Sequence, residues 1–257
     1  MVRFGFPILL LLAFATLSVN ANFNVTSLNT TLILNTNGSA HVVEALTLYI
    51  SNSSIAQYQQ DRQAINFTLT NWQAALNTNL LVEHILNSKS SVYGFTFLPG
   101  PVAYSGTSGN AQLTLSYFVN NVTSVKTIAP RKFLYTFNDA VFNFVHTASG
   151  QSLPQIGKMN IIVPKGSQIV SIYPVPDFPA LSFISNYTGS TTFTWISQTP
   201  LSAFSFSYII TESPGQEVAA FFGTLYTNYS ALLFLLVAIV LLALVAYLYL
   251  RVSNTQV

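Results

Sequence analysis

The feature that most constrains the fold lies near the end of the chain, where residues Ser230–Leu250 contain no charged residue, glycine or proline. A helix of this length would span about 31 Å, which matches the hydrocarbon core of a bilayer. Tyr226 and Tyr229 precede the segment, and Tyr247 and Tyr249 close it. Aromatic side chains favour such positions at the membrane interface. We therefore expect residues 230–250 to form a single transmembrane helix.

The beginning of the chain has the pattern of a secretory signal peptide. Arg3 is followed by an apolar run over Phe4–Leu17, and small side chains at Val19 and Ala21 precede the expected cleavage site. We expect a signal peptide over residues 1–21, with an uncleaved signal anchor as the alternative. Export places the next domain outside the cell, and Arg251 agrees with a cytoplasmic tail over residues 251–257. The expected location is the cell membrane, in a single-pass topology.

The composition of the chain excludes several classes of function. Only 6% of the residues are charged, whereas 51% are hydrophobic, and there is no cysteine. Residues 22–229 carry seven basic and seven acidic side chains, so this region is neutral and has no electrostatic pattern for nucleic acid. The absence of cysteine excludes disulfides, thiol nucleophiles and thiolate metal sites.

The exposed region has the pattern of a mainly β protein. Asn37-Gly38 separates two strand-like runs, residues 24–35 and 39–50, and this dipeptide favours a tight hairpin turn. We expect a helix over Trp72–Leu86 with Asn71 as its N-cap, with an irregular strand pair as the alternative. Further strands are expected over residues 64–70, 92–98, 112–119, 132–137, 141–146, 159–163, 168–173, 191–196 and 203–210.

This series of short strands favours a β-sandwich of the immunoglobulin-like (Ig-like) kind, and the sequence leaves open whether there are one or two. The length favours a boundary near residues 120–130. We expect an N-terminal β-rich domain over residues 22–125, with one helix, and a C-terminal β-sandwich over residues 126–212. Residues 213–229 would form a membrane-proximal stalk.

The candidate catalytic and metal-binding residues do not converge in the sequence. His41 and Glu44 are three apart on an expected strand, so they should face opposite sides. Glu83 and His84 are adjacent on an expected helix and cannot converge either. We expect no metal, no cofactor and no catalytic site; a site assembled from distant carboxylates such as Asp61, Asp139 and Asp177 is the alternative.

Aromatic residues alternate with polar or small ones over residues 133–144. We expect these side chains to form one face of a hairpin that packs in the core, with a sugar- or peptide-binding platform as the alternative. They are Phe133, Tyr135, Phe137, Phe142 and Phe144.

Asn-x-Ser/Thr motifs are frequent in the exposed region, and each is a glycan acceptor motif on an exported chain. Asn228 also has the motif but lies too close to the expected membrane span. We expect glycosylation at Asn24, Asn29, Asn37, Asn52, Asn66, Asn121 and Asn186.

Two stretches resemble cell-surface membrane glycoproteins of thermoacidophilic archaea. Thr31–Ile50, with Asn-Gly-Ser-Ala-His-Val-Val-Glu, resembles their opening β-hairpin, and Ile161–Ile210, with Ile-Ile-Val-Pro-Lys-Gly, is similar to their second sandwich. The resemblance covers about a third of the chain. It implies a β-sandwich ectodomain and a place at the cell surface, and it implies no catalytic residue.

Together these features favour a non-enzymatic type I membrane glycoprotein that presents a β-sandwich for envelope assembly or partner binding. Its partners would be the membrane and a protein of the envelope. The first alternative is an accessory subunit of a membrane complex, such as glycosylation or export machinery. The second alternative is a membrane-anchored extracellular hydrolase.

Overall fold

The structure is a computed structural model. It describes residues 23–86, 92–148, 150–180 and 186–215, and further along only 218–219, 222–223, 226–227, 229, 234 and 239–242. Within these residues no helix is long and apolar enough to cross a membrane. The expected signal peptide, residues 1–21, lies outside the described residues, as does most of the expected span, residues 230–250.

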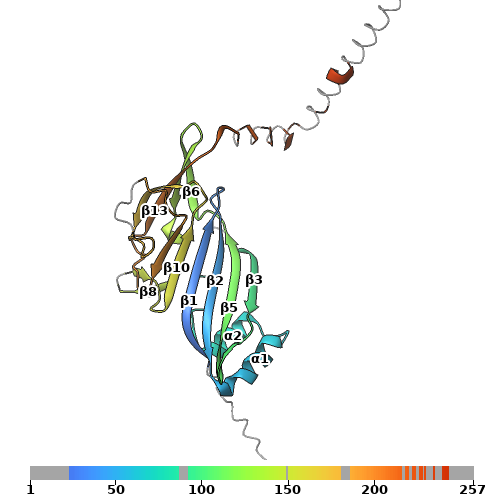
Figure 1. Cartoon of the computed structure of the whole chain (residues 1–257), viewed down its shortest axis with the longest axis vertical. Helices are drawn as coiled ribbons and strands as arrows, with labels where there is room; N and C mark the ends of the chain where they lie inside the picture. The colour runs from blue at the N-terminus through green and yellow to red at the C-terminus, as the bar shows by residue number, and fades with distance from the viewer. Residues whose placement is uncertain are drawn as a thin grey trace, which may run out of the picture.

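The described chain is mainly β, as the sequence predicts (Figure 1). The strands are β1 (Phe23–Leu34), β2 (Ala40–Ile50), β3 (Tyr93–Pro99), β4 (Ala103–Ser105), β5 (Ser108–Val119), β6 (Thr123–Ala129), β7 (Lys132–Phe137), β8 (Val145–Thr147), β9 (Gly150–Ser152), β10 (Gly157–Ile162), β11 (Gln168–Tyr173), β12 (Thr192–Ile196) and β13 (Ser205–Thr211). The helices are α1 (Ile55–Gln63) and α2 (Leu69–Leu76), with 3₁₀ turns η1 (Asn52–Ser54) and η2 (Asp139–Val141).

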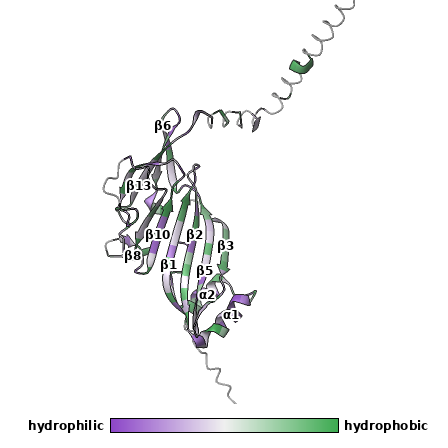
Figure 2. Ribbon diagram, viewed as in Figure 1, coloured by the Kyte–Doolittle hydropathy of each residue, from purple (hydrophilic) through white to green (hydrophobic). Residues whose placement is uncertain are grey.

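The larger sheet has seven strands in the order β12-β10-β1-β2-β5-β3, with β4 also paired to β5. Strand β1 lies in its middle, antiparallel to β2 and parallel to β10. Buried and more exposed residues alternate along β1, β2 and β5, so one face of this sheet is covered and the other faces solvent. Figure 2 shows hydrophobic and hydrophilic residues interspersed along these long strands.

The smaller sheet has four strands in the order β11-β13-β7-β6. The two sheets meet through aromatic side chains. Trp195 of β12 packs edge-on against Phe204 and Phe206, with ring centroids 5.2 and 6.4 Å apart. Phe193 of β12 also contacts Phe206, at 5.6 Å. A continuous hydrophobic core therefore joins both sheets.

The helices cover the larger sheet at the end opposite β6 (Figure 1). Trp72 of α2 and Tyr58 of α1 are fully buried, and their rings lie 5.3 Å apart. Phe23, at the start of β1, packs edge-on against Tyr58 at 5.7 Å. The two helices are thus fixed to the sheet by an aromatic cluster rather than by a broad apolar stripe.

Several sequence predictions are confirmed. The turn at Asn37-Gly38 joins β1 to β2, and Gly38 has the positive φ of 83° that such a turn requires. Strands β7 and β11 have the predicted bounds, and most other predicted strands differ by a few residues. The aromatic residues Tyr135, Phe137, Phe142 and Phe144 are buried in the core and Phe133 is partly buried, as core packing predicts. They do not form one face of a hairpin, because β7 pairs with β6 and β13 and Phe142 follows η2.

Other predictions are wrong. Residues 64–70 do not form a strand, because helix α2 begins at Leu69 with Thr68, and not Asn71, as its N-cap. The helix ends at Leu76, where Asn77 adopts a left-handed conformation with φ 47°, and does not reach Leu86. Helix α1 is an additional helix. Residues 141–146 form the end of η2 and the start of β8 and not a single strand.

The expected domain boundary at residues 125/126 falls inside strand β6. Strand β10, from the expected second domain, is hydrogen-bonded to β1 of the expected first domain. Strands of both expected domains therefore lie in one sheet. The expected stalk, residues 213–229, is described only in part.

Candidate functional site

A buried polar cluster lies under the covered face of the larger sheet. Glu44 of β2 faces inward, and its Oε2 lies 2.5 Å from Nδ1 of His84. Its Oε1 accepts hydrogen bonds from the backbone N–H of His84, at 2.8 Å, and from the hydroxyl of Tyr117 on β5. All three residues are at most 2% exposed. The carboxylate is therefore satisfied by partners from β5 and from the segment after α2.

Tyr117 links this cluster to the backbone as well. Its hydroxyl oxygen accepts a hydrogen bond from the N–H of Ile85, at 3.2 Å, while its proton goes to Glu44. Burial, and then the negative charge of Glu44, raise the pKa of Tyr117 well above its ordinary value. The phenol is thus held in its neutral, donating form.

The cluster fixes residues 83–86 against residues 141–143. The N–H of Asn143 donates to the carbonyl of His84 at 2.7 Å, and the N–H of Leu86 donates to the carbonyl of Val141 at 2.7 Å. The ring of Phe144 stacks on His84 with centroids 4.9 Å apart. The two segments form a small two-stranded patch, with Ile85 and Phe142 in a bridge.

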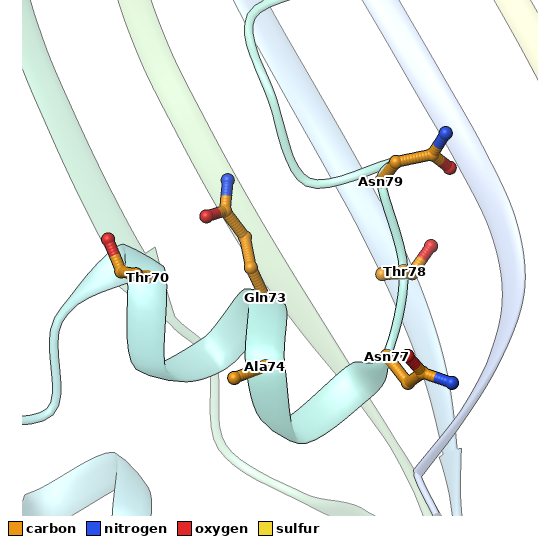
Figure 3. Close-up of a pocket in the computed structure, with 6 residues that line it drawn as sticks. All are labelled: Thr70, Gln73, Ala74, Asn77, Thr78 and Asn79. Carbon is orange, nitrogen blue, oxygen red and sulfur yellow. The ribbon is translucent and has the colours of Figure 1, made fainter.

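Three hollows are connected by shared lining residues, and one of them includes residues of this patch. The first, of about 550 Å³, is lined by α2 and the residues that follow it, from Thr70 to Asn79. Figure 3 shows the hydroxyl of Thr70 and the amide of Gln73 projecting from the same side of α2, with Asn79 on the segment beyond. Asn79 also lines the second hollow, and His146 lines both the second and the third. The second hollow thus shares a lining residue with each of the other two, and we call the three together the polar groove.

The second hollow, of about 400 Å³, is the one that touches the buried cluster. His84 lines it together with His146 and the amides of Asn79 and Asn143. Asn143 is held in place because its side-chain amide donates to the carbonyl of Glu83 at 3.0 Å. The Glu44–His84 pair thus supports the middle of the polar groove from below.

The third hollow, of about 390 Å³, is lined by Asp139, His146, Gln151 and Ser202, among others. This is a combination of side chains that hydrolases use. Among the residues that the structure describes, however, no hydrogen bond joins Asp139, His146 and Ser202. His146 instead has Gln151 as its neighbour, with their side-chain nitrogens 3.4 Å apart.

The candidate residues that meet in the structure are not those that lie close together in the sequence. His41 and Glu44 do face opposite sides of the sheet, since His41 binds Ser116 on the outer face at 2.7 Å. The residue that Glu44 meets is His84, forty positions away. No signal in the sequence indicated this pair. Asp61 lies on α1, Asp139 lies in η2, and Asp177 accepts a hydrogen bond from the N–H of Ile196 in β12. Within the described ranges no three His, Asp or Glu side chains could hold a metal ion.

The expected glycosylation sites differ in their surroundings. Asn24, Asn37, Asn52, Asn66, Asn121 and Asn186 are exposed. Asn29 is half-buried on the outer face of β1, where its Oδ1 accepts a hydrogen bond from the amide of Asn160 at 2.7 Å. Asn37 and Asn186 lie in turns, although each Oδ1 also accepts a hydrogen bond, from Ser39 and Gln168 respectively.

Comparison with models of protein families found no match to this chain. A comparison with curated protein sequences found no match either.

Proposed function

We propose that this protein is a non-enzymatic type I membrane glycoprotein of the cell surface. Its signal peptide is removed, residues 230–250 anchor it in the membrane, and its mainly β region is a sandwich exposed outside the cell. The sandwich presents the polar groove to neutral glycan chains of neighbouring envelope components. Such binding would serve envelope assembly, in keeping with the resemblance to archaeal surface glycoproteins.

The observation that carries this proposal is the lining of the polar groove, in which uncharged hydrogen-bonding side chains are mixed with apolar ones and one carboxylate. Amides of Gln73, Asn79 and Asn143 and the hydroxyl of Thr70 line it. Gln73 and Asn143 each use one N–H on a backbone carbonyl, and each keeps a second N–H and an oxygen that can bond to a ligand. Asp139 is the one carboxylate among its lining residues, and no lysine or arginine lines it. A ligand rich in hydroxyl groups matches this chemistry better than a charged one does.

The middle of the polar groove is held rigidly from below, and an ordered surface favours ligand binding. The Glu44–His84 pair and the bonds between residues 83–86 and 141–143 hold its middle part in one conformation. A binding surface that is already ordered loses little conformational entropy when its ligand binds.

The test is binding of neutral glycans, released from the native cell surface, to the purified full chain. Asn79→Ala removes an amide that lines two of the hollows, and we expect binding to weaken by about threefold to tenfold. Asn110→Ala, on the exposed outer face of β5, is the matched control and should bind as the native chain does. Equal binding by both variants would contradict the proposal.

A second candidate function is that of an accessory subunit in a membrane complex. It is favoured by the edge of the larger sheet at β3 and β4. There the side chains of Tyr93, Phe95, Leu98 and Tyr104 are between 41% and 68% exposed. Exposed apolar side chains of this kind mark contact surfaces between proteins. Purification from gently solubilised membranes would reveal such a complex as a stable, co-purifying multi-span protein.

A further inference from the structure

We propose that the end of the domain from which the chain continues toward its anchor binds anionic lipid headgroups. This surface, the basic end, consists of the β6–β7 hairpin and the turn between β10 and β11, with Lys126, Lys132 and Lys165 as its cationic side chains. The inference rests on the proposed membrane anchor, and it adds a second contact between the protein and the bilayer.

The chain leaves the domain after β13, beside the β6–β7 hairpin. The last residue of β13, Thr211, pairs with Lys132 at the start of β7. The N–H of Glu212 then donates to the carbonyl of Arg131 in the β6–β7 turn, at 2.9 Å. The chain therefore leaves the domain directly beside this hairpin. Figure 1 shows β6 at the end of the molecule from which the chain after β13 departs.

The β10–β11 turn lies at the same end. Lys165 occupies this turn, which is closed by a bond from the N–H of Ser167 to the carbonyl of Pro164 at 3.2 Å. Gln168, the first residue of β11, pairs with Ile209, two residues before the end of β13. Lys165 and the β6–β7 hairpin thus flank the exit of the chain.

The fold distributes basic and acidic side chains unevenly over the domain. The basic end gathers Lys126, Lys132 and Lys165, three of the five lysines between positions 22 and 229. Glu212 is the one carboxylate that the described residues place beside it. Glu44 and Asp61, by contrast, are buried elsewhere. Among the described residues, none of the three lysines forms an ion pair with a carboxylate. A neutral domain thus presents a positive end.

The edge strand of the smaller sheet, β6, carries both a lysine and exposed apolar side chains. Val125 and Ile128 are 43% and 44% exposed, and they flank Lys126 in the sequence. Helices that lie in the membrane interface combine apolar side chains with lysines, and this exposed edge strand offers the same two kinds of side chain. Each lysine close to an anionic surface strengthens membrane binding by about fivefold. The basic end therefore suits anionic headgroups.

The segment between the domain and the expected membrane span is short enough to keep the basic end near the bilayer. Seventeen residues separate Glu212 from Ser230, where the expected membrane span begins. In helical form they would cover about 26 Å, and any bend would bring the domain closer to the bilayer. The attraction between lysines and headgroups acts within a Debye length, about 10 Å at 0.1 M salt, so contact requires the basic end to tilt onto the surface.

The experiment uses the full chain in lipid nanodiscs made either of phosphatidylcholine alone or with added phosphatidylglycerol. An amine-reactive reagent labels the lysines, and peptide mass spectrometry gives the rate at each position. We expect labelling of Lys126 and Lys132 to slow by about fivefold or more in the anionic discs and to recover at high salt. Lys158, exposed on the outer face of β10, is the control and should react equally in both. Equal rates for Lys126 and Lys132 in the two kinds of disc would overturn the inference.

Two variants sharpen the result. In the Lys126→Gln/Lys132→Gln chain, Lys165 should lose its protection in anionic discs, whereas Lys158→Gln should leave that protection intact. Heparin serves as a soluble polyanion in neutral discs. If it protects Lys126 and Lys132 more strongly than anionic lipid does, the surface binds polyanions in general and the assignment to lipid is overturned.

Flotation with neutral vesicles separates this inference from the proposed anchor. A chain that fails to float with them contradicts the anchor itself. A chain that floats, but whose lysines react equally in neutral and anionic discs, contradicts only the role of the basic end.

Discussion

Glu44 and His84 form a buried pair whose Oε2 and Nδ1 atoms lie 2.5 Å apart, although the residues are forty positions apart in the sequence. Glu44 belongs to the second strand of the larger sheet, and His84 belongs to the segment that carries the middle of the polar groove. The pair therefore couples the stability of the sheet to the shape of the surface that we propose for binding.

Replacing Glu44 by alanine should destabilise the fold strongly. The N–H of His84 and the hydroxyl of Tyr117 would lose their acceptor inside the core, which costs about 3–5 kcal/mol of unfolding free energy. Urea denaturation of the chain in mild detergent measures the change. Glu83→Ala, next in sequence to His84, is the control and should change stability by less than about 0.5 kcal/mol. Similar midpoints for both variants would show that the buried pair contributes little.

Tyr117→Phe should have a smaller effect in the same direction. The variant keeps the ring but leaves one oxygen of Glu44 with fewer donors and the N–H of Ile85 without an acceptor. We expect a loss of about 1–3 kcal/mol in unfolding free energy. Tyr93→Phe removes an exposed hydroxyl that binds Asn120 at 3.3 Å, and it should be nearly neutral. A Tyr117→Phe variant with unchanged unfolding free energy would contradict the role given to this phenol.

Asp61 should make stability depend on pH. Burial raises the pKa of this carboxyl above its ordinary value of 3.8, and its bond to Gln57 opposes the shift. The protonated form is therefore favoured in the folded state. This contribution is fully present below pH 3.8 and is lost as the pH rises through the raised pKa.

Asp61→Asn should consequently match the native chain in acid and exceed it at neutral pH. Removing a negative charge from the last turns of α1 adds about 0.3–1 kcal/mol through the helix dipole. Thermal unfolding across the acidic to neutral range measures the difference. Gln60→Asn, on the exposed side of the same helix, should show a difference that does not vary with pH. If the stability difference between Asp61→Asn and the native chain were also the same at every pH, the prediction would be contradicted.

Glycan occupancy should differ among the acceptor motifs. Asn29 is half-buried and bound to Asn160 in the middle of a sheet, so a folded chain offers it poorly to a glycosyltransferase. Asn37, Asn52 and Asn66 are exposed, and we expect them to be occupied. Peptide mass spectrometry of native material measures each site. Full occupancy at Asn29 would contradict the accessibility argument, and bare Asn37 and Asn186 would contradict a glycan-covered surface.

Deletion of residues 230–257 should release a folded, soluble ectodomain. The expected span is wholly apolar, so its place depends on lipid and not on contacts with the sheets. Secretion of a monomer with cooperative unfolding would agree with a surface protein. Aggregation that only a co-expressed membrane partner prevents would favour the accessory-subunit alternative instead.

Local patterns in the sequence predicted the parts of the fold that local forces determine. Asn37-Gly38 has the turn chemistry of a hairpin, the aromatic residues of 133–137 alternate with the period of a strand, and residues 168–173 are rich in β-branched and aromatic side chains. Helix α1 escaped prediction because Tyr58 is its one large buried apolar residue. Its place depends on Phe23 and Trp72, which come from distant elements.

The candidate site was beyond sequence reasoning for a similar reason. The strand period correctly separated His41 from Glu44, which face opposite sides of β2. Glu83 and His84 were separated on the assumption of a helix, whereas α2 ends at Leu76 and does not include them. The pair that does form takes one member from each, and it exists only because β2 and the segment after α2 pack together. Strand β6 was likewise not predicted, and a domain boundary was expected there, since its exposed residues lack an alternating apolar pattern.

The parallel pairing of β1 with β10 has a consequence for how the protein is made. Asn29 and Asn160, whose side chains bind across these strands, are 131 positions apart. A chain that crosses the membrane from its N-terminus exposes β1 long before β10 arrives. Until then one edge of β1 offers unpaired peptide groups to any passing strand, so the emerging chain is open to misassociation. Secretion in the presence of a chaperone that shields this edge should therefore raise the yield of the folded protein.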